Sequence, residues 1–348
     1  MKKESPDYLR MSTAASITLG FKSGLFYRNA KLYCINLLLT YEEGCSANCA
    51  YCGLSLGRKG RFSKKSFIRV EWPTYALRDI IERMIEKRDG IKRVCISMIT
   101  NKRAVKDTKF VTRYIAERVD LPISLLVTPT ILSRDDIVDF KELGADMLGI
   151  AFDAATPELF NLYRGSGVSG PHKWKRYFTC FKEGISVFGE RMVGVHLIVG
   201  LNETEREMVK FIQEIYDMGG QTHLFSFFPE PMSRLAHYPQ PPMGQYRRIQ
   251  LARFLIDKGI DRAERFKFDI HERIVDFGLP RDELLRIVER GTPFMTSGCP
   301  GRDGEVACTR PYANSLPGPD IRNFPFPPGR EDIEKIKREL EIERYKNA

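Results

Sequence analysis

The sequence predicts an α/β protein whose main part is a partial barrel of six β/α units. Short apolar runs alternate six times with segments of helical period along residues 31–260, which is the pattern of a parallel sheet with right-handed crossovers. Hydrophobic residues make up 43% of the chain, which is normal for a globular protein with a large core. Six units indicate an open (β/α)6 barrel of the TIM type rather than the closed eight-stranded form.

Each expected strand is a short apolar run, and each expected helix has an amphipathic period. The strands are expected at residues 31–41, 91–99, 122–129, 145–152, 191–201 and 221–228. The helices are expected at residues 73–88, 111–119, 133–143, 172–189, 203–219 and 243–259. Ser133 opens the third of these helices and is expected to cap it.

The pattern divides the chain into three segments. Residues 1–30 are expected to form an N-terminal extension and residues 31–260 the partial barrel. Residues 261–348 are expected to form a C-terminal extension that is rich in loops and ends in a charged helix. Its Pro- and Gly-rich stretch at 297–320 contains two cysteines.

The charge and the chain start bear on compartment and partners. The formal net charge is +10 and the basic residues are dispersed, so the surplus is either a solvated surface or an attraction for an acidic protein, and nucleic acid is not favoured. The first residues have no apolar signal region and no apolar run has membrane length. We therefore expect a cytoplasmic protein, no membrane partner and cysteines that serve as ligands, catalytic thiols or core residues.

Three of the eight cysteines lie together in CSANCAYC, directly after the first expected strand. They are Cys45, Cys49 and Cys52, at the edge where parallel α/β barrels carry out their chemistry. A structural zinc ion normally has four ligands, whereas three thiolates leave one iron of a [4Fe–4S] cluster open. A zinc loop completed by a distant residue is the alternative.

This CxxxCxxC spacing after the first strand of a six-unit barrel resembles that of radical S-adenosylmethionine (radical SAM) enzymes, as does the aromatic Tyr51. The resemblance implies that Cys45, Cys49 and Cys52 hold a [4Fe–4S] cluster whose open iron binds SAM, and that Tyr51 lies against the adenine. It also implies that SAM is cleaved to a 5′-deoxyadenosyl radical, which takes hydrogen from a substrate C–H bond.

The stretch GIAFDAATPELFNLYRG at 149–165 is compatible with the same family. The resemblance implies that Asp153 bonds the ribose hydroxyls and that Arg164 pairs with the SAM carboxylate, a match that arginine makes well. The alternative for Arg164 is a surface position on a helix.

The stretch VGVHLIVGLNE at 193–203 resembles the family's motif at the fifth strand. The resemblance implies that Gly200 lets the backbone approach the adenosine, with Glu203 nearby. The alternative is a buried strand that meets a helix N-terminus, where Glu203 is favourable.

The chain departs from the family after the second strand. There the family usually has a Gly-Gly-Glu stretch for the SAM amino group, and this chain has CISMITNKR. Backbone carbonyls, Ser97 or Thr100 are the candidates to replace it.

A second set of cysteines is spread along the chain. Cys34 starts the first strand, and Cys299 and Cys308 lie in the loop-rich tail. At about 3.3 Å per residue, Cys34 lies roughly 15–20 Å from the triplet, at the opposite mouth of the barrel. If the tail returns to that mouth, these three cysteines can hold a second cluster. The alternative for Cys34 is packing as a small apolar residue.

The stretches LLLTYEEGCSANCAYCGL, DAATPELFNLYRG and SGCPGRDGEVACTRPYANSLPG are similar to the two-protein lipoyl synthase of archaea and some bacteria. The similarity implies sulfur insertion into an octanoyl chain, with an auxiliary [4Fe–4S] cluster on Cys34, Cys299 and Cys308 as the sulfur source. It implies three partners: an octanoylated lipoyl carrier protein of the glycine-cleavage H type, a sister radical SAM subunit and an electron donor such as ferredoxin.

The remaining cysteines and the fourth auxiliary ligand are less defined. Cys95 lies in a strand and Cys180 in a helical stretch, and both are expected in the core. Ser297, Ser315 and Arg310 are the candidates for the fourth ligand, since related sulfur-insertion enzymes use a serine or an arginine there.

Two other functions remain open at this point. One is a biotin-synthase-like or hydrogenase-maturation-like radical SAM enzyme that acts on a small molecule. The other is a zinc-stabilised nucleic-acid binder. Iron with acid-labile sulfide distinguishes both radical SAM readings from the zinc protein.

Overall fold

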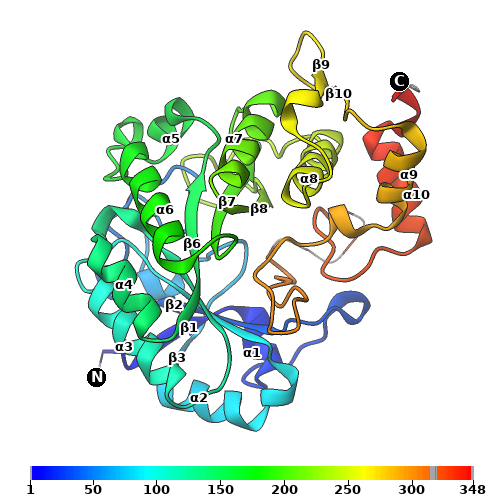
Figure 1. Cartoon of the computed structure of the whole chain (residues 1–348). Helices are drawn as coiled ribbons and strands as arrows, with labels where there is room; N and C mark the ends of the chain where they lie inside the picture. The colour runs from blue at the N-terminus through cyan, green and yellow to red at the C-terminus, as the bar shows by residue number, and fades with distance from the viewer. Residues whose placement is uncertain (1, 314–317, 319, 346–348) are drawn as a thin grey trace.

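The computed structural model describes residues 2–313, 318 and 320–345 and has one large sheet at its centre (Figure 1). Six of its strands are parallel neighbours in chain order, as predicted. They are β2 (Cys34–Leu39), β4 (Arg93–Ser97), β5 (Ile123–Val127), β6 (Ala145–Asp153), β7 (Val193–Val199) and β8 (Gln221–Ser226). The fold is therefore α/β with a mostly parallel sheet, consistent with a partial TIM-type barrel.

Two antiparallel strands extend the sheet beyond β2. β1 (Tyr8–Met11) pairs with β2, and β3 (Thr74–Ala76) pairs with β1. β1 comes from the N-terminal extension, for which the sequence analysis predicted no strand. It follows that residues before the barrel are built into its sheet.

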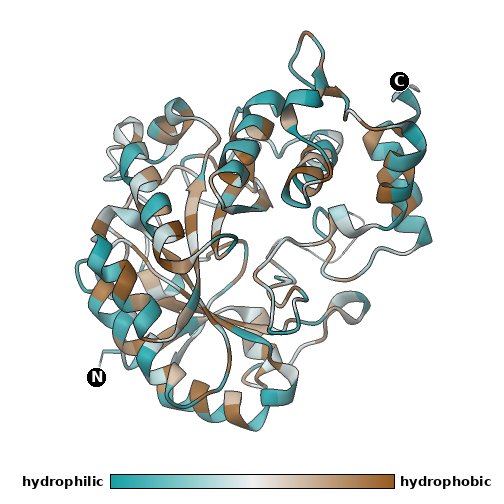
Figure 2. Ribbon diagram, in the orientation of Figure 1, coloured by the Kyte–Doolittle hydropathy of each residue, from teal (hydrophilic) through white to brown (hydrophobic). Residues whose placement is uncertain are grey.

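The helices that follow the strands lie outside the sheet (Figure 1). The helices up to residue 257 are α1 (Thr13–Thr18), α2 (Leu77–Glu86), α3 (Ala104–Ala116), α4 (Arg134–Glu142), α5 (Pro157–Tyr163), α6 (Trp174–Phe188), α7 (Glu205–Asp217) and α8 (Met243–Asp257). In α2, α3, α4, α6 and α7 the apolar side meets the sheet and the polar side faces outward (Figure 2), which is what an amphipathic period produces. α8 differs, because Arg247, Arg248 and Gln250 are buried in it together with its apolar residues.

The predicted helix boundaries are correct where a cap marks them. Ser133 caps α4 and forms a capping box with Asp136, as expected. The helix expected at 111–119 begins earlier, at Ala104. The sequence did not mark this start, because the first turns are polar and have no side-chain cap. The helix expected from residue 73 begins at Leu77, because the preceding three residues pair with β1.

The C-terminal extension packs against the β8 side of the barrel. It contains the hairpin β9 (Lys267–Phe268) and β10 (Ile274–Asp276), then α9 (Arg281–Glu289) and α10 (Arg330–Leu340). The orange segment between these helices returns toward the sheet (Figure 1), and its Thr309 hydroxyl donates to the Lys31 carbonyl (2.5 Å) shortly before β2. None of the described helices is long and apolar enough to cross a membrane.

Candidate active site

The triplet loop follows β2 at the carboxyl edge of the parallel strands. The Ser46 amide donates to the Thr100 carbonyl after β4 (2.8 Å), and the Ala50 amide donates to the Tyr163 carbonyl at the end of α5 (2.8 Å). The Leu54 amide donates to Cys52 Sγ (3.4 Å). These bonds fix the loop to two neighbouring crossovers, so the three thiols are held by the barrel and not by the loop alone.

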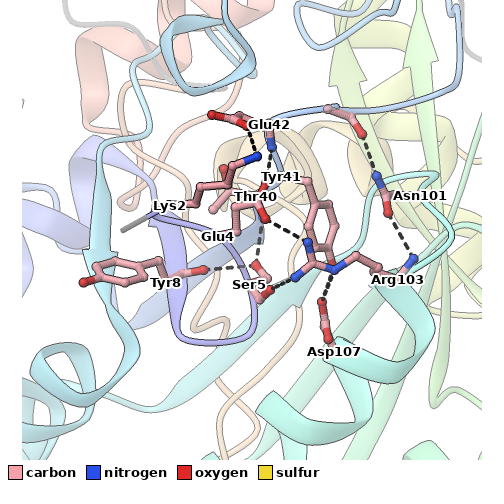
Figure 3. Close-up of polar contacts among 11 residues, drawn as sticks. Lys2, Glu4, Ser5, Tyr8, Thr40, Tyr41, Glu42, Asn101, Arg103 and Asp107 are labelled. Atoms are coloured by element: carbon pink, nitrogen blue, oxygen red, sulfur yellow. Dashed lines mark hydrogen bonds and ion pairs between the residues drawn. The ribbon is translucent and has the colours of Figure 1, made fainter.

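The N-terminal extension fixes the chain that enters this loop (Figure 3). Ser5 exchanges two hydrogen bonds with Thr40, each 2.9 Å, and the Glu42 amide donates to Glu4 Oε1 (2.7 Å). Arg103 at the start of α3 donates to Glu4 Oε2 (2.8 Å) and to the Ser5 carbonyl (2.6 Å). The extension is thus tied to both β2 and α3.

Two side-chain bonds continue this support up to the first cysteine (Figure 3). The Tyr41 hydroxyl donates to Asp107 Oδ2 (2.9 Å) in α3. Asn101 Nδ2 donates to the Gly44 carbonyl (3.1 Å), one residue before Cys45. The backbone that leads into the thiol loop is therefore constrained residue by residue.

The thiols of the triplet suit a cluster of iron and sulfide. Burial raises the pKa of Cys49 and raises the pKa of Cys52 well above its ordinary value, and Arg164 partly offsets the effect at Cys49. A bound metal cluster supplies the charge that holds such thiols deprotonated. Among the described residues, no three His, Cys, Asp or Glu side chains are arranged around a single metal ion.

Tyr51, Asp153 and Arg164 meet beside the triplet. The Tyr51 hydroxyl donates to Asp153 Oδ2, and Arg164 Nη1 lies 3.3 Å from the same carboxylate oxygen. Asp153 ends β6 with a positive φ of 65°, at a point where the register with β7 shifts. The bulge turns this carboxylate toward the thiol loop.

Arg164 is buried, with 5% of its surface exposed. Its Nη1 also donates to the carbonyls of Ala151 and Phe152, and its Nη2 donates to the Tyr177 hydroxyl (3.1 Å). The surface position that the sequence left open for Arg164 is therefore wrong. In the structure Arg164 contacts Asp153 and backbone carbonyl oxygens, and it also lines the cavity.

Gly200 and Glu203 lie in the turn that follows β7. Glu203 accepts hydrogen bonds from the amides of Gly200 and Leu201, both at 2.7 Å. Burial raises the pKa of Glu203 to about 7. Gly200 has a φ of +106°, and a Cβ there would lie 2.7 Å from the Pro241 ring. The structure thus gives both residues a part in the turn after β7, while β7 itself contributes His196 and Ile198 to the cavity.

A cavity of about 200 Å³ lies between the triplet loop and the strand ends. Apolar side chains form much of its wall, including Met98, Leu126 and Phe225. Thr100, a candidate for contact with SAM after β4, also lines it, whereas Ser97 is not part of its lining. A long apolar substrate can therefore approach the triplet from the barrel interior.

Several polar residues of the cavity were missed in the sequence analysis. His172 and His196 line it, together with Arg69 and Glu230 from its outer rim. The Arg69 amide donates to Glu230 Oε1 (2.6 Å). Burial lowers the pKa of His196 to about 3, so this ring is neutral. No local motif marks these positions, because they meet only when the crossovers are folded.

Cys34, Cys299 and Cys308 come together at the other end of the strands. Asn36 Nδ2 lies 3.5 Å from Cys34 Sγ and 3.4 Å from Cys308 Sγ. A hydrogen bond from Cys34 lowers the pKa of Cys308 to about 6, while burial raises the pKa of Cys34. The amides of Ala307 (3.0 Å) and Cys308 (3.3 Å) both donate to the Cys299 carbonyl, so the tail holds Cys299 next to Cys308.

The segment between the tail cysteines folds back on itself. Pro300 and Val306 form an antiparallel bridge, so the insertion brings Cys299 and Cys308 together. Arg93 Nε donates to the Pro300 carbonyl (2.5 Å), and Lys92 pairs with Asp303 (2.6 Å). The tail is thereby bound to the start of β4.

The candidates for a fourth ligand are differently placed. Ser297 accepts a hydrogen bond from the Leu224 amide (3.0 Å) and Arg310 stacks on Phe225, with 4.2 Å from its guanidinium carbon to the ring centroid. Ser315 lies outside the described residues. Cys180 is fully buried in α6, as expected, whereas Cys95 is only partly buried within β4.

Comparisons with known proteins place the fold and the triplet in one family. The Radical SAM superfamily matches residues 41–215, which include the triplet loop and most of the barrel. No curated protein matches the sequence. Among solved structures, methylornithine synthase (PylB) has a TM-score of 0.51 at 13% identity, over 96% of this chain and 87% of that one.

The [FeFe]-hydrogenase maturase HydG also has a TM-score of 0.51 at 13% identity, over 70% of this chain and 53% of that one. At such identity, both neighbours support the fold alone. The family match is stronger evidence of family membership, because it covers the CxxxCxxC loop and the strands that follow it. The chain belongs to the radical SAM superfamily.

Proposed function

We propose that this protein is a component of a two-protein lipoyl synthase, which inserts sulfur into an octanoyl chain carried on a protein. The family implies a [4Fe–4S] cluster and SAM, and Cys45, Cys49 and Cys52 are the residues that would hold that cluster. The proposal adds an auxiliary [4Fe–4S] cluster on Cys34, Cys299 and Cys308, which would be the source of sulfur.

One observation carries the proposal: the tail thiols meet Cys34 at the far end of β2 from the triplet. Asn36 contacts the sulfurs of both Cys34 and Cys308. Six residues of strand separate this end from the triplet loop, which is about 20 Å at 3.3 Å per residue. An extended acyl chain fits between two such groups.

When bound, SAM and its cluster supply a 5′-deoxyadenosyl radical, for which a ferredoxin-type donor provides one electron, and the auxiliary cluster supplies sulfide. For each sulfur atom inserted, one C–H bond of the substrate would break and its hydrogen atom would be transferred to 5′-deoxyadenosine. One C–S bond would form, and the electron released would be taken up by the cluster that Cys34, Cys299 and Cys308 would hold.

The residues of the chain would position these parts. The apolar cavity wall would hold the octanoyl chain and exclude water, with Met98 and Leu126 between the two thiol sets. Tyr51, Asp153 and Arg164 form a hydrogen-bonded group beside Cys49, in which Asp153 is the acceptor. We assign to this group the binding of SAM, with Gly200 and Glu203 shaping the turn behind it.

The proposed partners follow from the charge of the chain. A net charge of +10 would attract an acidic lipoyl carrier of the glycine-cleavage H type and speed its encounter. A sister radical SAM subunit would insert the other sulfur. The eight free cysteines fit a reducing compartment, and we place the reaction in the cytoplasm.

Single-turnover assays with SAM and reductant test this function. The substrates are carrier proteins with octanoyl or singly thiolated octanoyl lysine, and mass spectrometry measures 5′-deoxyadenosine and added sulfur. Wild type should yield both products from one of the two substrates. Cys49→Ala should yield neither, Cys308→Ala should yield 5′-deoxyadenosine only, and Cys180→Ser should match wild type.

Two results would overturn the proposal. One is a wild-type protein that cleaves SAM but adds no sulfur to either carrier, alone or with its sister subunit. The other is a Cys308→Ala variant that still transfers sulfur. Either result would favour a radical SAM enzyme acting on a small molecule.

A further inference from the structure

We infer that Cys95 is the fourth ligand of a [4Fe–4S] site at the lower end of the barrel, completing a set of four thiolates with Cys34, Cys299 and Cys308. The inference rests on the proposed auxiliary cluster and deepens it. It replaces the serine and arginine candidates that the sequence left open.

The strand register puts Cys95 on the same face as the other thiols. Asn36 in β2 is directly opposite Cys95 in β4, and paired residues of neighbouring parallel strands project to the same side of a sheet. The Asn36 side chain contacts the sulfurs of Cys34 and Cys308. The Cys95 side chain therefore projects toward those two sulfurs.

Two of the four thiols are joined by one polar side chain. Asn36 joins Cys34 to Cys308. Ser124 on β5, the next strand of the sheet, is directly opposite Cys95, and its hydroxyl donates to the Val94 carbonyl (3.5 Å).

The tail residues that reach this site are held by β4 itself. Arg93, two residues before Cys95 and on the same face, donates to the Pro300 carbonyl next to Cys299 (2.5 Å). Arg310, two residues after Cys308, donates to the carbonyl of Ser297 (2.5 Å), two residues before Cys299. Two cations thus lie beside a site whose ligands would carry four negative charges.

Cys95 differs from an ordinary core cysteine in its exposure. Its strand neighbours Val94 and Ile96 are fully buried, yet Cys95 and Cys299 are both only partly buried. Cys180 is the contrasting case, because it is fully buried in α6. Cys95 and Cys299 thus share an exposure that the core cysteine does not have.

Cys95 also lies on the substrate side of the proposed cluster. Cys34 is level with Arg93, and Cys95 is two residues further along the strand. Three residues beyond it, Met98 lines the cavity below the triplet. Of the four ligands, Cys95 is thus the one from the strand that continues into the cavity wall.

Iron and sulfide counts in a background without the SAM cluster test this assignment. The background is Cys45→Ala/Cys49→Ala/Cys52→Ala, and into it are placed Cys95→Ala, Cys95→Ser or the control Cys180→Ala. Each protein is reconstituted anaerobically, checked for fold by circular dichroism, and measured for iron, sulfide and zinc. Electron paramagnetic resonance after mild oxidation then reports a three-iron cluster.

The background and Cys180→Ala should each hold about four irons. Cys95→Ala should either lose at least half of this iron or give a three-iron signal on oxidation, and Cys95→Ser should lie between them. Four irons and unchanged oxidation in folded Cys95 variants would overturn the assignment but leave the auxiliary cluster intact. A background with no iron, or with zinc in its place, would overturn the auxiliary cluster as well.

Discussion

Asp153 and Arg164 form a partly enclosed ion pair beside the triplet loop, with 14% and 6% of their side chains exposed. Arg164 also donates to two backbone carbonyls, so its charge is compensated by several oxygens. Tyr51 contributes a third member from the thiol loop. At the residue scale, this group connects the end of β6 to the loop that carries the cysteines.

We predict that Asp153→Asn destabilises the protein by about 3 kcal/mol, because it leaves a buried guanidinium without its carboxylate. The melting temperature of the reconstituted protein, measured anaerobically, checks this. Asp120→Asn is the matched control, since Asp120 pairs with Arg302 at an exposed surface, and it should leave the melting temperature unchanged. Equal effects from the two variants would contradict the prediction.

Glu203 gives a prediction about pH. Burial raises the pKa of Glu203 from 4.5 to about 7, so the folded protein holds this proton more tightly than the unfolded chain. The stabilisation is complete below pH 4.5 and is lost as the pH rises through 7. Relative to Glu203→Gln, wild type should thus lose about 3 kcal/mol between pH 4.5 and 8.

Melting temperatures of wild type and Glu203→Gln at several pH values in this range measure the effect. The variant also loses one good acceptor for a backbone amide, but that loss does not depend on pH. The difference between the two proteins should therefore change with pH by a few degrees. Two curves that stay parallel would rule out a raised pKa at Glu203.

The triplet could be predicted from the sequence because its spacing is local. The environment of Cys95 could not be predicted in this way. Cys95 was expected in the core because it stands in an apolar strand. Its neighbours depend on the β2–β4 register and on a tail about 200 residues later in the chain. Similarly, Arg164 could not be distinguished from a surface arginine until its carbonyl partners on β6 were known.

At the scale of elements, the N-terminal extension supports the active-site loop. β1 pairs with β2, and Arg103 at the start of α3 holds Glu4 and Ser5 next to Thr40 and Glu42. The loop therefore rests on a strand, a helix and the chain terminus. A displacement of any of these elements would be transmitted to the cysteines, which are only a few residues away along the chain.

Arg103→Ala should loosen the triplet loop, because it removes the donors that connect α3 to the extension. We expect a loss of about 1–2 kcal/mol and faster removal of iron by a chelator. Arg113→Ala on the exposed side of the same helix is the control and should behave as wild type. Equal rates of iron loss in all three proteins would contradict this role.

The strands and helices of the barrel were predictable because their apolar patterns are local, and the cap at Ser133 was correct. β1 and β3 were missed because each is four residues or fewer and is stabilised by a partner distant in sequence. The early start of α3 was missed because its first turns have no cap. Local sequence patterns thus predict the strands and helices of the barrel, whereas short strands such as β1 and β3 depend on pairing with residues distant in sequence.

At the scale of the whole molecule, the barrel separates two sets of thiols. The sheet holds the triplet, with the apolar cavity beside it, at the carboxyl ends of its strands and the second set toward the amino ends. The C-terminal extension closes the lower end through contacts with β4 and β8. The central claim is that each thiol set holds its own iron–sulfur cluster.

Iron and acid-labile sulfide in the reconstituted protein test this claim most directly. Wild type should hold about eight irons per chain, and Cys34→Ala/Cys299→Ala/Cys308→Ala should keep about four and still cleave SAM. About four irons in both proteins would contradict the claim, leaving a radical SAM enzyme with a single cluster.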